Sequence, residues 1–268
     1  MENKGVRLDV WLVEQGFAGG RDKAKELLTA EAVTVNGRTV TKPAARITPA
    51  DRVVCSASAP RYVGRGGHKL EKAIEAAALV LHGAVAMDVG ASTGGFTDCM
   101  LQYGAAHVYA VDVGHDQLHA TLRQDPRVTV LEGTDVRSRA LADCVSEGSI
   151  TFCSVDVSFV SLSYVLPSVV PYLAPDSTLV CLIKPQFEAG KGDIGKRGVV
   201  KEPKVHVRVL QEQLALFRRL EFATTWLSHS PITGGEGNIE YLAVLRLQGE
   251  SGVFDPAAVV KTAFSELG

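Results

Sequence analysis

Between residues 85 and 247 the sequence alternates short apolar, β-rich runs with amphipathic helical stretches. The runs that predict strands are Val85–Val89, His107–Val113, Val128–Leu131, Ile150–Val155, Leu179–Ile183, Thr224–Leu227 and Tyr241–Leu247. The stretches that predict helices are Leu70–Leu81, Asp98–Tyr103, His115–Arg123, Leu162–Leu173 and Pro203–Leu220. Near-continuous apolar strands that alternate with helices predict a buried, mostly parallel sheet with helices on both faces, which is a doubly wound α/β fold.

Residues 1–59 predict a separate, small α+β domain. Arg21–Thr29 has apolar residues at helical spacing, and so does an earlier segment with Val6, Leu8, Trp11 and Leu12. Asn36-Gly37 separates two short β-rich runs, and this dipeptide supplies the positive φ that a type I′ turn requires. We therefore expect two short helices and a small sheet that contains a hairpin.

The segment that follows has the composition of a linker. Residues 56–67 (SASAPRYVGRGG) contain one proline and three glycines, so we place the linker at residues 60–67 and the second domain at residues 68–268. Residues 1–65 carry eleven Lys and Arg against seven Asp and Glu, whereas residues 66–268 carry 17 against 23. A basic N-terminal part indicates an anionic partner, although a merely solvated face has the same composition.

The apolar runs and the cysteines indicate the cellular compartment in which the protein functions. No apolar run approaches the roughly 18 residues that a membrane helix needs. The first residues, MENKGVRLDVW, have a charge too early for the apolar core of a signal peptide. The five cysteines are odd in number, widely spaced and without a CxxC pair, so the sequence predicts neither a disulfide partner nor a metal site. We expect a cytoplasmic protein with no membrane partner.

The stretch MDVGASTGGFTDCM has the pattern of a strand, a glycine-rich turn and the start of a helix. A dinucleotide fingerprint here would use Gly90, position 92 and Gly95, and Ser92 at the middle glycine position argues against NAD or FAD. The same residues spell the GxSxG elbow of serine hydrolases, with Ser92 as nucleophile and His206 or His229 as base. No preceding strand and loop are predicted that could build an oxyanion hole, so a hydrolase is the weaker alternative.

A nucleoside cofactor without phosphates fits this turn better. Gly90 and Gly94 let the chain turn sharply beside a small zwitterion. Asp112 closes the second strand, 24 residues after Asp88, where a carboxylate can accept hydrogen bonds from a ribose diol. Asp135, just past the third strand, can accept from an adenine amino group. This order of residues indicates S-adenosylmethionine, although each acid alone is also an ordinary turn or helix-start residue.

Four charged residues lie where a doubly wound sheet places its chemistry, near the ligand-side ends of its elements. Asp156, Lys184 and Glu240 adjoin strands, and Lys69 lies in the glycine-rich entry to the domain. Lys184 is the candidate base for a weak acid such as a ribose 2′-hydroxyl, because four apolar residues precede it and a proline follows. Asp156 would orient Lys184, Lys69 would stabilise developing alkoxide charge, and Glu240 would hold Lys69 or the sugar.

At these motifs the chain resembles a known family. RGGHKL, DVGASTGGFT, AVDVG, DVSFVSL, KPQFEAGKG and GNIEY are close to the pattern of the TlyA, or hemolysin A, family of bacterial ribosomal RNA methyltransferases. The resemblance implies a Rossmann-like class I methyltransferase domain of the FtsJ type, with a Lys-Asp-Lys-Glu tetrad at Lys69, Asp156, Lys184 and Glu240. It also implies that S-adenosylmethionine is bound by Asp88, Gly90, Ser92, Gly94, Gly95, Phe96, Asp112 and Asp135.

The N-terminal part resembles the RNA-binding domain of the type found in ribosomal protein S-four. Arg7-Leu8-Asp9, Asn36-Gly37 and Lys42-Pro43 are among the matching residues. Two positions depart from the pattern, because Gly20 stands where serine is common and Glu31 where glycine is common. The residues expected to contact the RNA backbone are Arg7, Arg21, Lys23, Lys25, Arg38 and Lys42.

The resemblance implies 2′-O-methylation of cytidine in ribosomal RNA, within ribosomal subunits. Phe159 is a candidate for stacking on RNA, with packing between helix and sheet as the alternative. Three other functions stay open from the residues. They are a non-catalytic RNA-binding or ribosome-assembly protein with a vestigial cofactor pocket, the serine hydrolase, and a methyltransferase that acts on a base.

Overall fold

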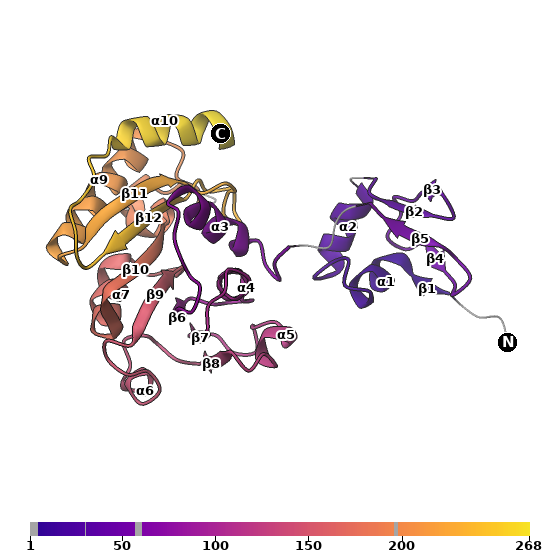
Figure 1. The fold of residues 1–268 in the computed structure, drawn as a ribbon. Helices are drawn as coiled ribbons and strands as arrows, with labels where there is room; N and C mark the ends of the chain where they lie inside the picture. The colour runs from indigo at the N-terminus through magenta and orange to yellow at the C-terminus, as the bar shows by residue number, and fades with distance from the viewer. Residues whose placement is uncertain (1–4, 30, 57–60, 196–197) are drawn as a thin grey trace. The chain divides into compact units, whose positions relative to one another are not determined.

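The computed structural model of the chain describes residues 5–29, 31–56, 61–195 and 198–268 (Figure 1). The chain divides into two compact units, residues 1–64 and residues 65–268. The division lies within the segment predicted as a linker, residues 60–67, whose first residue is outside the described residues.

The first unit packs two short helices against small sheets. The elements are β1 (Val6–Arg7), α1 (Leu8–Glu14), α2 (Arg21–Thr29), β2 (Val33–Val35), β3 (Arg38–Thr39), β4 (Arg46–Ile47) and β5 (Val53–Cys55). A three-stranded sheet has the order β3-β2-β5, and β1 pairs with β4. The predicted hairpin is present, with positive φ at Asn36 and Gly37. Apolar side chains from both helices form the core with the sheet residue Val33, as the helical spacing predicts.

The second unit is built on one seven-stranded sheet in the order β11-β12-β10-β9-β6-β7-β8. The strands are β6 (Val85–Val89), β7 (His107–Asp112), β8 (Val128–Glu132), β9 (Ile150–Val155), β10 (Leu173–Ile183), β11 (Ala223–His229) and β12 (Tyr241–Arg246). Strand β12 runs antiparallel to both of its neighbours, and all other neighbouring pairs are parallel. The prediction of a mostly parallel sheet is confirmed.

Helices cover both faces of this sheet, with α3 and α4 on one side and α7 and α9 on the other (Figure 1). The helices are α3 (Gly66–Ala76), α4 (Gly95–Gln102), α5 (Ala120–Arg123), α6 (Arg139–Ala142), α7 (Leu162–Val169), α8 (Pro185–Glu188), α9 (Pro203–Arg219) and α10 (Pro256–Leu267), with 3₁₀ turns η1 (Val170–Tyr172) and η2 (Lys191–Asp193). Because side chains alternate along a strand, Cys181 and Ile183 join the core beside α7 and α9 while Leu182 points to the opposite face.

Three predicted helices differ from the structure by four or more residues at one end or both. The helix predicted at His115–Arg123 begins only at Ala120, because the Glu132 carboxylate accepts hydrogen bonds from the backbone N–H groups of residues 116–118 and holds them in a turn. The first helix of this unit begins at Gly66 and ends at Ala76, rather than spanning Leu70–Leu81. Helix α7 ends at Val169, and Leu173 already belongs to β10.

Candidate active site

The turn after β6 brings the backbone of two strand ends together. Gly90 has a φ of +88°, and a Cβ there would lie 2.5 Å from the carbonyl oxygen of Asp156 at the end of β9. Gly94, with a φ of +93°, is the N-cap of α4. A side chain at Gly90 would therefore separate the two strand ends that border the candidate site.

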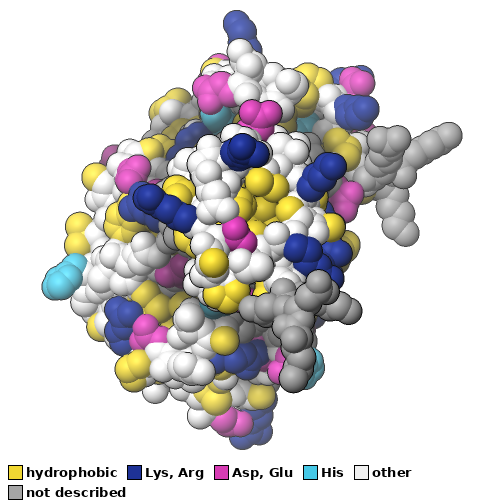
Figure 2. Space-filling model, turned by 90° about the vertical axis from the view of Figure 1, so that its right-hand side faces the viewer, with side chains coloured by type: hydrophobic (Ala, Val, Ile, Leu, Met, Phe, Trp, Pro, Cys, Tyr) yellow, Lys and Arg dark blue, Asp and Glu magenta, His cyan; other side chains and the backbone are white. Residues whose placement is uncertain are grey.

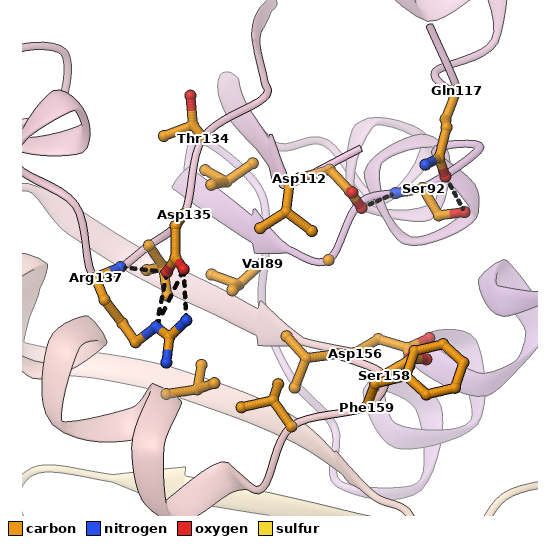
Figure 3. A pocket seen from close by; sticks show the side chains of 17 residues that line it. Val89, Ser92, Asp112, Gln117, Thr134, Asp135, Arg137, Asp156, Ser158 and Phe159 are labelled. Carbon is orange, nitrogen blue, oxygen red and sulfur yellow. Dashed lines mark hydrogen bonds and ion pairs between the residues drawn. The ribbon is translucent and has the colours of Figure 1, made fainter. Parts of the chain in front are cut away.

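A cavity of about 310 Å³ opens beside this turn (Figure 3). Predicted residues that line it include Gly90, Ser92, Asp112, Asp135 and Asp156. Figure 3 shows Asp112 and Ser92 joined on one side, Asp135 and Arg137 on another, and Phe159 near Asp156. Sequence positions up to 76 residues apart, Val89 and Val165, thus meet around one space at the carboxyl ends of parallel strands, where doubly wound folds bind ligands.

Hydrogen bonds fix two of the acids that line this cavity, Asp112 and Asp135. The Asp112 carboxylate accepts from the backbone N–H groups of Ser92, at 2.8 Å, and Gly114, at 2.7 Å. Asp135 accepts from the backbone N–H of Arg137 and pairs with its guanidinium at 2.6 Å. The Arg137 side chain is the largest influence that lowers the pKa of Asp135. Both acids are therefore held in one orientation by groups next to the cavity.

A second cavity, of about 170 Å³, lies against the same turn. It is lined by residues that include Lys69, Gly95, Phe96 and Arg65, and Arg65 donates a hydrogen bond to the Thr233 carbonyl oxygen at 3.0 Å. Gly90, Ser92 and Asp156 line both cavities. The two spaces therefore adjoin at the glycine-rich turn.

The four residues predicted as a tetrad form two close pairs. Lys69 Nζ lies 2.7 Å from Glu240 Oε2, and Lys184 Nζ lies 2.6 Å from Asp156 Oδ1. Both lysines are 8% exposed and Glu240 is 2% exposed. Since isolated charges are costly to bury, each lysine is retained there by its carboxylate.

Asp88, predicted to bind the cofactor, lies beneath the turn and lines neither cavity. It is fully buried, and its carboxylate accepts hydrogen bonds from Thr97 Oγ1 and Ser154 Oγ, each at 2.7 Å. Burial raises the pKa of Asp88 to about 6, against the opposing effect of the two hydroxyl donors. In this position Asp88 supports the turn from below by joining α4 to β9.

The residues of the hydrolase alternative do not assemble. Ser92 Oγ donates to Gln117 Oε1 at 3.2 Å. His206 is buried between the Tyr241 hydroxyl and the Val200 carbonyl oxygen, and burial lowers its pKa. His229 lies against the Ser230 carbonyl oxygen. Within the described part of the chain, neither histidine is placed to take a proton from Ser92.

The basic residues predicted to bind RNA differ in their contacts. Arg7 and Arg21 both pair with the buried carboxylate of Asp9, at 2.9 and 3.0 Å. The other two partnered residues make exposed ion pairs within α2, Lys23 with Glu26 and Lys25 with Asp22.

Arg38 and Lys42 are exposed. On the face of the molecule in Figure 2, Lys and Arg side chains are scattered among hydrophobic and acidic ones.

The fold and the cavity beside the glycine-rich turn define a class, the methyltransferases that use S-adenosylmethionine, and this is the cofactor predicted from the sequence. Residues 62–247 match the FtsJ-like methyltransferase family, and residues 6–53 match the S4 domain. The chain belongs to the FtsJ-like methyltransferase family and carries an S4 domain before the methyltransferase domain. Among the described residues, no helix combines the length and apolar character needed to cross a bilayer.

Individual relatives are similar in sequence to this protein along most of its length. The chain is 45% identical to YqxC of Bacillus subtilis, described as a candidate rRNA methyltransferase, over 93% of this chain and 89% of the relative. It is 41% identical to the 16S/23S rRNA (cytidine-2′-O)-methyltransferase TlyA of Mycobacterium tuberculosis, over 91% and 90%. A solved structure from Streptococcus thermophilus, described as a candidate hemolysin, is 40% identical with a TM-score of 0.76 and covers 98% and 97%.

Sequence reasoning missed two polar residues that contact the tetrad. Lys184 Nζ donates to Ser158 Oγ at 3.0 Å, and Gln186 Nε2 donates to Glu240 Oε1 at 3.2 Å. Each lies two residues after a predicted tetrad member, so the motifs DVSFVSL and KPQFEAGKG contained them. Their contacts cross between loops, which the spacing along one segment does not reveal.

Proposed function

We propose that this chain transfers a methyl group from S-adenosylmethionine to the 2′-hydroxyl of a cytidine in ribosomal RNA, within ribosomal subunits. The observation that carries the proposal is the pair of buried lysine–carboxylate contacts beside two adjoining cavities. Relatives at 41% identity that are named rRNA (cytidine-2′-O)-methyltransferases support the choice of substrate.

The residues of the larger cavity suit the cofactor. Asp112 would accept hydrogen bonds from the ribose diol, and Asp135 would accept from the adenine amino group. Gly90 leaves room for close approach at the turn, since a Cβ there would fill the gap to Asp156. When bound, the cofactor supplies an electrophilic methyl group on its sulfonium.

Lys184 would take the proton from the 2′-hydroxyl as the ribose oxygen gains the methyl group. Asp156 and Ser158 hold its Nζ at 2.6 and 3.0 Å, so the amine is fixed beside Asp156, which lines both cavities. Lys69, fixed by Glu240, would stabilise negative charge that develops on the ribose oxygen. Because methyl transfer requires an in-line approach, much of the rate would come from this positioning.

RNA would be held by contacts of two kinds. The S4 domain would use basic side chains on phosphates, which positions RNA without reading its sequence. Near the cavity, the Phe159 ring is 90% exposed and has a φ of +64°, a strained conformation for a non-glycine residue. It is not packed into the core, and we infer that it stacks on the target base.

The decisive experiment measures transfer of labelled methyl groups from S-adenosylmethionine to unmodified ribosomal subunits. Wild type should place alkali-resistant label on ribose. Lys184→Ala should reduce the rate about 10²–10⁴-fold, the usual contribution of a general base, while cofactor binding persists. Lys261→Ala, an exposed lysine of α10, is the matched control and should transfer at the wild-type rate.

The alternatives give different results in this assay. If wild type binds cofactor and subunits but transfers nothing, the chain is a non-catalytic RNA-binding or assembly protein. If label appears on a base and dinucleotides around it stay sensitive to alkali, the enzyme methylates bases. Mapping the labelled nucleotide tests the choice of cytidine and of subunit.

A further inference from the structure

The loop after β9 and the segment after β10 are joined at three successive places. Lys184 Nζ contacts Asp156 and Ser158, as described above. At the second place, the rings of Phe187 and Phe159 lie 4.9 Å apart between centroids, and Phe159 lines the larger cavity. The last contact is made by Glu188, at the end of α8.

The Glu188 carboxylate bridges three elements. Oε2 accepts from Ser161 Oγ at 2.7 Å and from Gln213 Nε2 of α9 at 2.9 Å, and Oε1 accepts from the backbone N–H of Leu162 at 2.9 Å. Ser161 is the N-cap of α7, so the carboxylate lies at the amino end of that helix, where negative charge is favoured. Glu188 is absent from the lining of both cavities.

We propose that Glu188 is a positioning residue for Lys184, because it fastens α8 to the start of α7 and so fixes the lysine against Asp156 and Ser158. The inference rests on the proposed function, in which Lys184 is the base. Lys184 immediately precedes α8 and Glu188 ends it. The four-residue helix therefore has the proposed base at one end and the Glu188 carboxylate at the other.

The chemistry of the site requires an acceptor at this position. All three partners of Glu188 are donors toward it, and an apolar side chain would leave the Leu162 N–H without that acceptor. The α7 and α8 segments would then separate more easily, and displacements near 1 Å in a reacting geometry cost about 10²-fold in rate.

The test compares three variants in single-turnover methyl transfer to unmodified ribosomal subunits. Glu188→Ala should lower the rate at least tenfold, with dissociation constants for cofactor and subunits within twofold of wild type. Glu188→Gln should recover most of the rate, because its amide oxygen can accept from Leu162, and its amide nitrogen can donate to Ser161 and to Gln213 Oε1 once the Gln213 amide turns over. Leu245→Ala, which creates a gap in the core at the far end of β12, should stay within twofold of wild type.

Amide hydrogen exchange gives a second readout that needs no activity. Peptides covering residues 156–165 should exchange faster in Glu188→Ala but not in Leu245→Ala. An unchanged rate in a folded Glu188→Ala variant, or an equal loss in Leu245→Ala, would overturn the positioning role. If wild type transfers no methyl group, the proposed function fails. Unchanged hydrogen exchange in Glu188→Ala would separately show that Glu188 does not hold α8 to the start of α7.

Discussion

The ion pairs of the predicted RNA-binding arginines and those of the predicted tetrad differ in how far the cation is exposed to solvent. In the first unit the acid is inside: Asp9 is fully buried, while the Arg7 and Arg21 side chains that pair with it are 39% and 57% exposed. Their guanidinium groups hold down the pKa of Asp9 far below its usual value. Each guanidinium carries five N–H donors, so both arginines keep donors free of this pairing for an anion in solvent.

In the second unit the cations are inside. Lys69 and Lys184 are each 8% exposed, and each lies against a carboxylate. A lysine this deeply buried can act only on a group that comes close to it within the site. The difference is consistent with the proposed function, in which charge on the first unit would attract and orient RNA and charge in the second would take part in the reaction.

The largest expected effect is a difference in unfolding free energy between variants that break a pair with a buried lysine and variants that break a pair with an exposed arginine. Glu240→Ala leaves Lys69 buried without its carboxylate, which should cost the second unit about 3 kcal/mol of unfolding free energy. Arg7→Ala removes an exposed partner, while Asp9 keeps Arg21, so the first unit should lose much less unfolding free energy than the second.

Urea unfolding can read the two units separately, because Trp11 lies in the first and Trp226 in the second. In a Trp11→Phe background the fluorescence reports only the second unit, and in Trp226→Phe only the first. Equal losses in the two units would contradict the distinction between buried and exposed cations.

Asp88 can be compared with Asp9, because both are buried acids. Asp9 is paired with arginines, whereas Asp88 accepts hydrogen bonds from hydroxyl groups. Its pKa is raised to about 6, so the folded state holds the proton more tightly than the unfolded chain does. Its contribution to stability is therefore present at low pH and is lost as pH rises through about 6. Between pH 4.5 and 7.5 the loss should be about 2 kcal/mol.

The measurement compares wild type with Asp88→Asn across this range in the Trp11→Phe background. The variant should gain stability relative to wild type as pH rises, with no further gain above about pH 7.5. A constant difference at all pH values would mean that Asp88 is ionised throughout.

Phe159 is the proposed uncharged contact to RNA, and its effect on binding can be compared with that of the arginines of the first unit. Phe159→Ala should weaken binding to ribosomal subunits about tenfold, because stacking on a base is worth roughly 1–3 kcal/mol, and the slope of log affinity against log salt should stay unchanged. Phe159→Tyr keeps the ring and should bind as wild type does. Arg21→Ala should instead reduce the salt slope by about one. If Phe159→Ala alters the slope as well, the two units do not differ in this way.

Much of the fold was predictable because its signals are local. The strands at Val85–Val89 and Ile150–Val155 were predicted to the residue, since each is an apolar run with clear ends. The helix predicted at His115–Arg123 was wrong over its first five residues. Its start depends on Glu132, a residue of a neighbouring strand, and local spacing carries no information about that carboxylate.

The candidate site divides in the same manner. The sequence placed Asp156 and Lys184 at the ends of strands, and parallel strands bring such ends to one edge. Glu240 was predicted to precede the last strand, and it reaches the same edge because β12 runs antiparallel to its neighbours. The sequence could not indicate that Asp88 lies beneath the turn rather than at the cavity, because a buried acid and an exposed one look alike in a strand pattern. Nor could it reveal Glu188, whose partners lie 25 to 27 residues away.

The smallest expected effect concerns Glu31 in the first unit, where the sequence departs from its family's pattern. Glu31 has a φ of +56°, a left-handed conformation that residues with a Cβ adopt at a cost. The glycine common at this position is explained by that geometry. Glu31→Gly should stabilise the first unit by about 0.5–1 kcal/mol, read from Trp11 in the Trp226→Phe background.

Glu31→Ala separates backbone strain from charge, because alanine removes the acid and keeps the Cβ. Alanine should leave stability unchanged, whereas both variants should bind ribosomal subunits slightly more tightly at low salt through the lost negative charge. Equal stabilisation by alanine and glycine would assign the cost to repulsion among acids instead. In that case the stability of the first unit would be limited at this position by repulsion between charges and not by backbone strain.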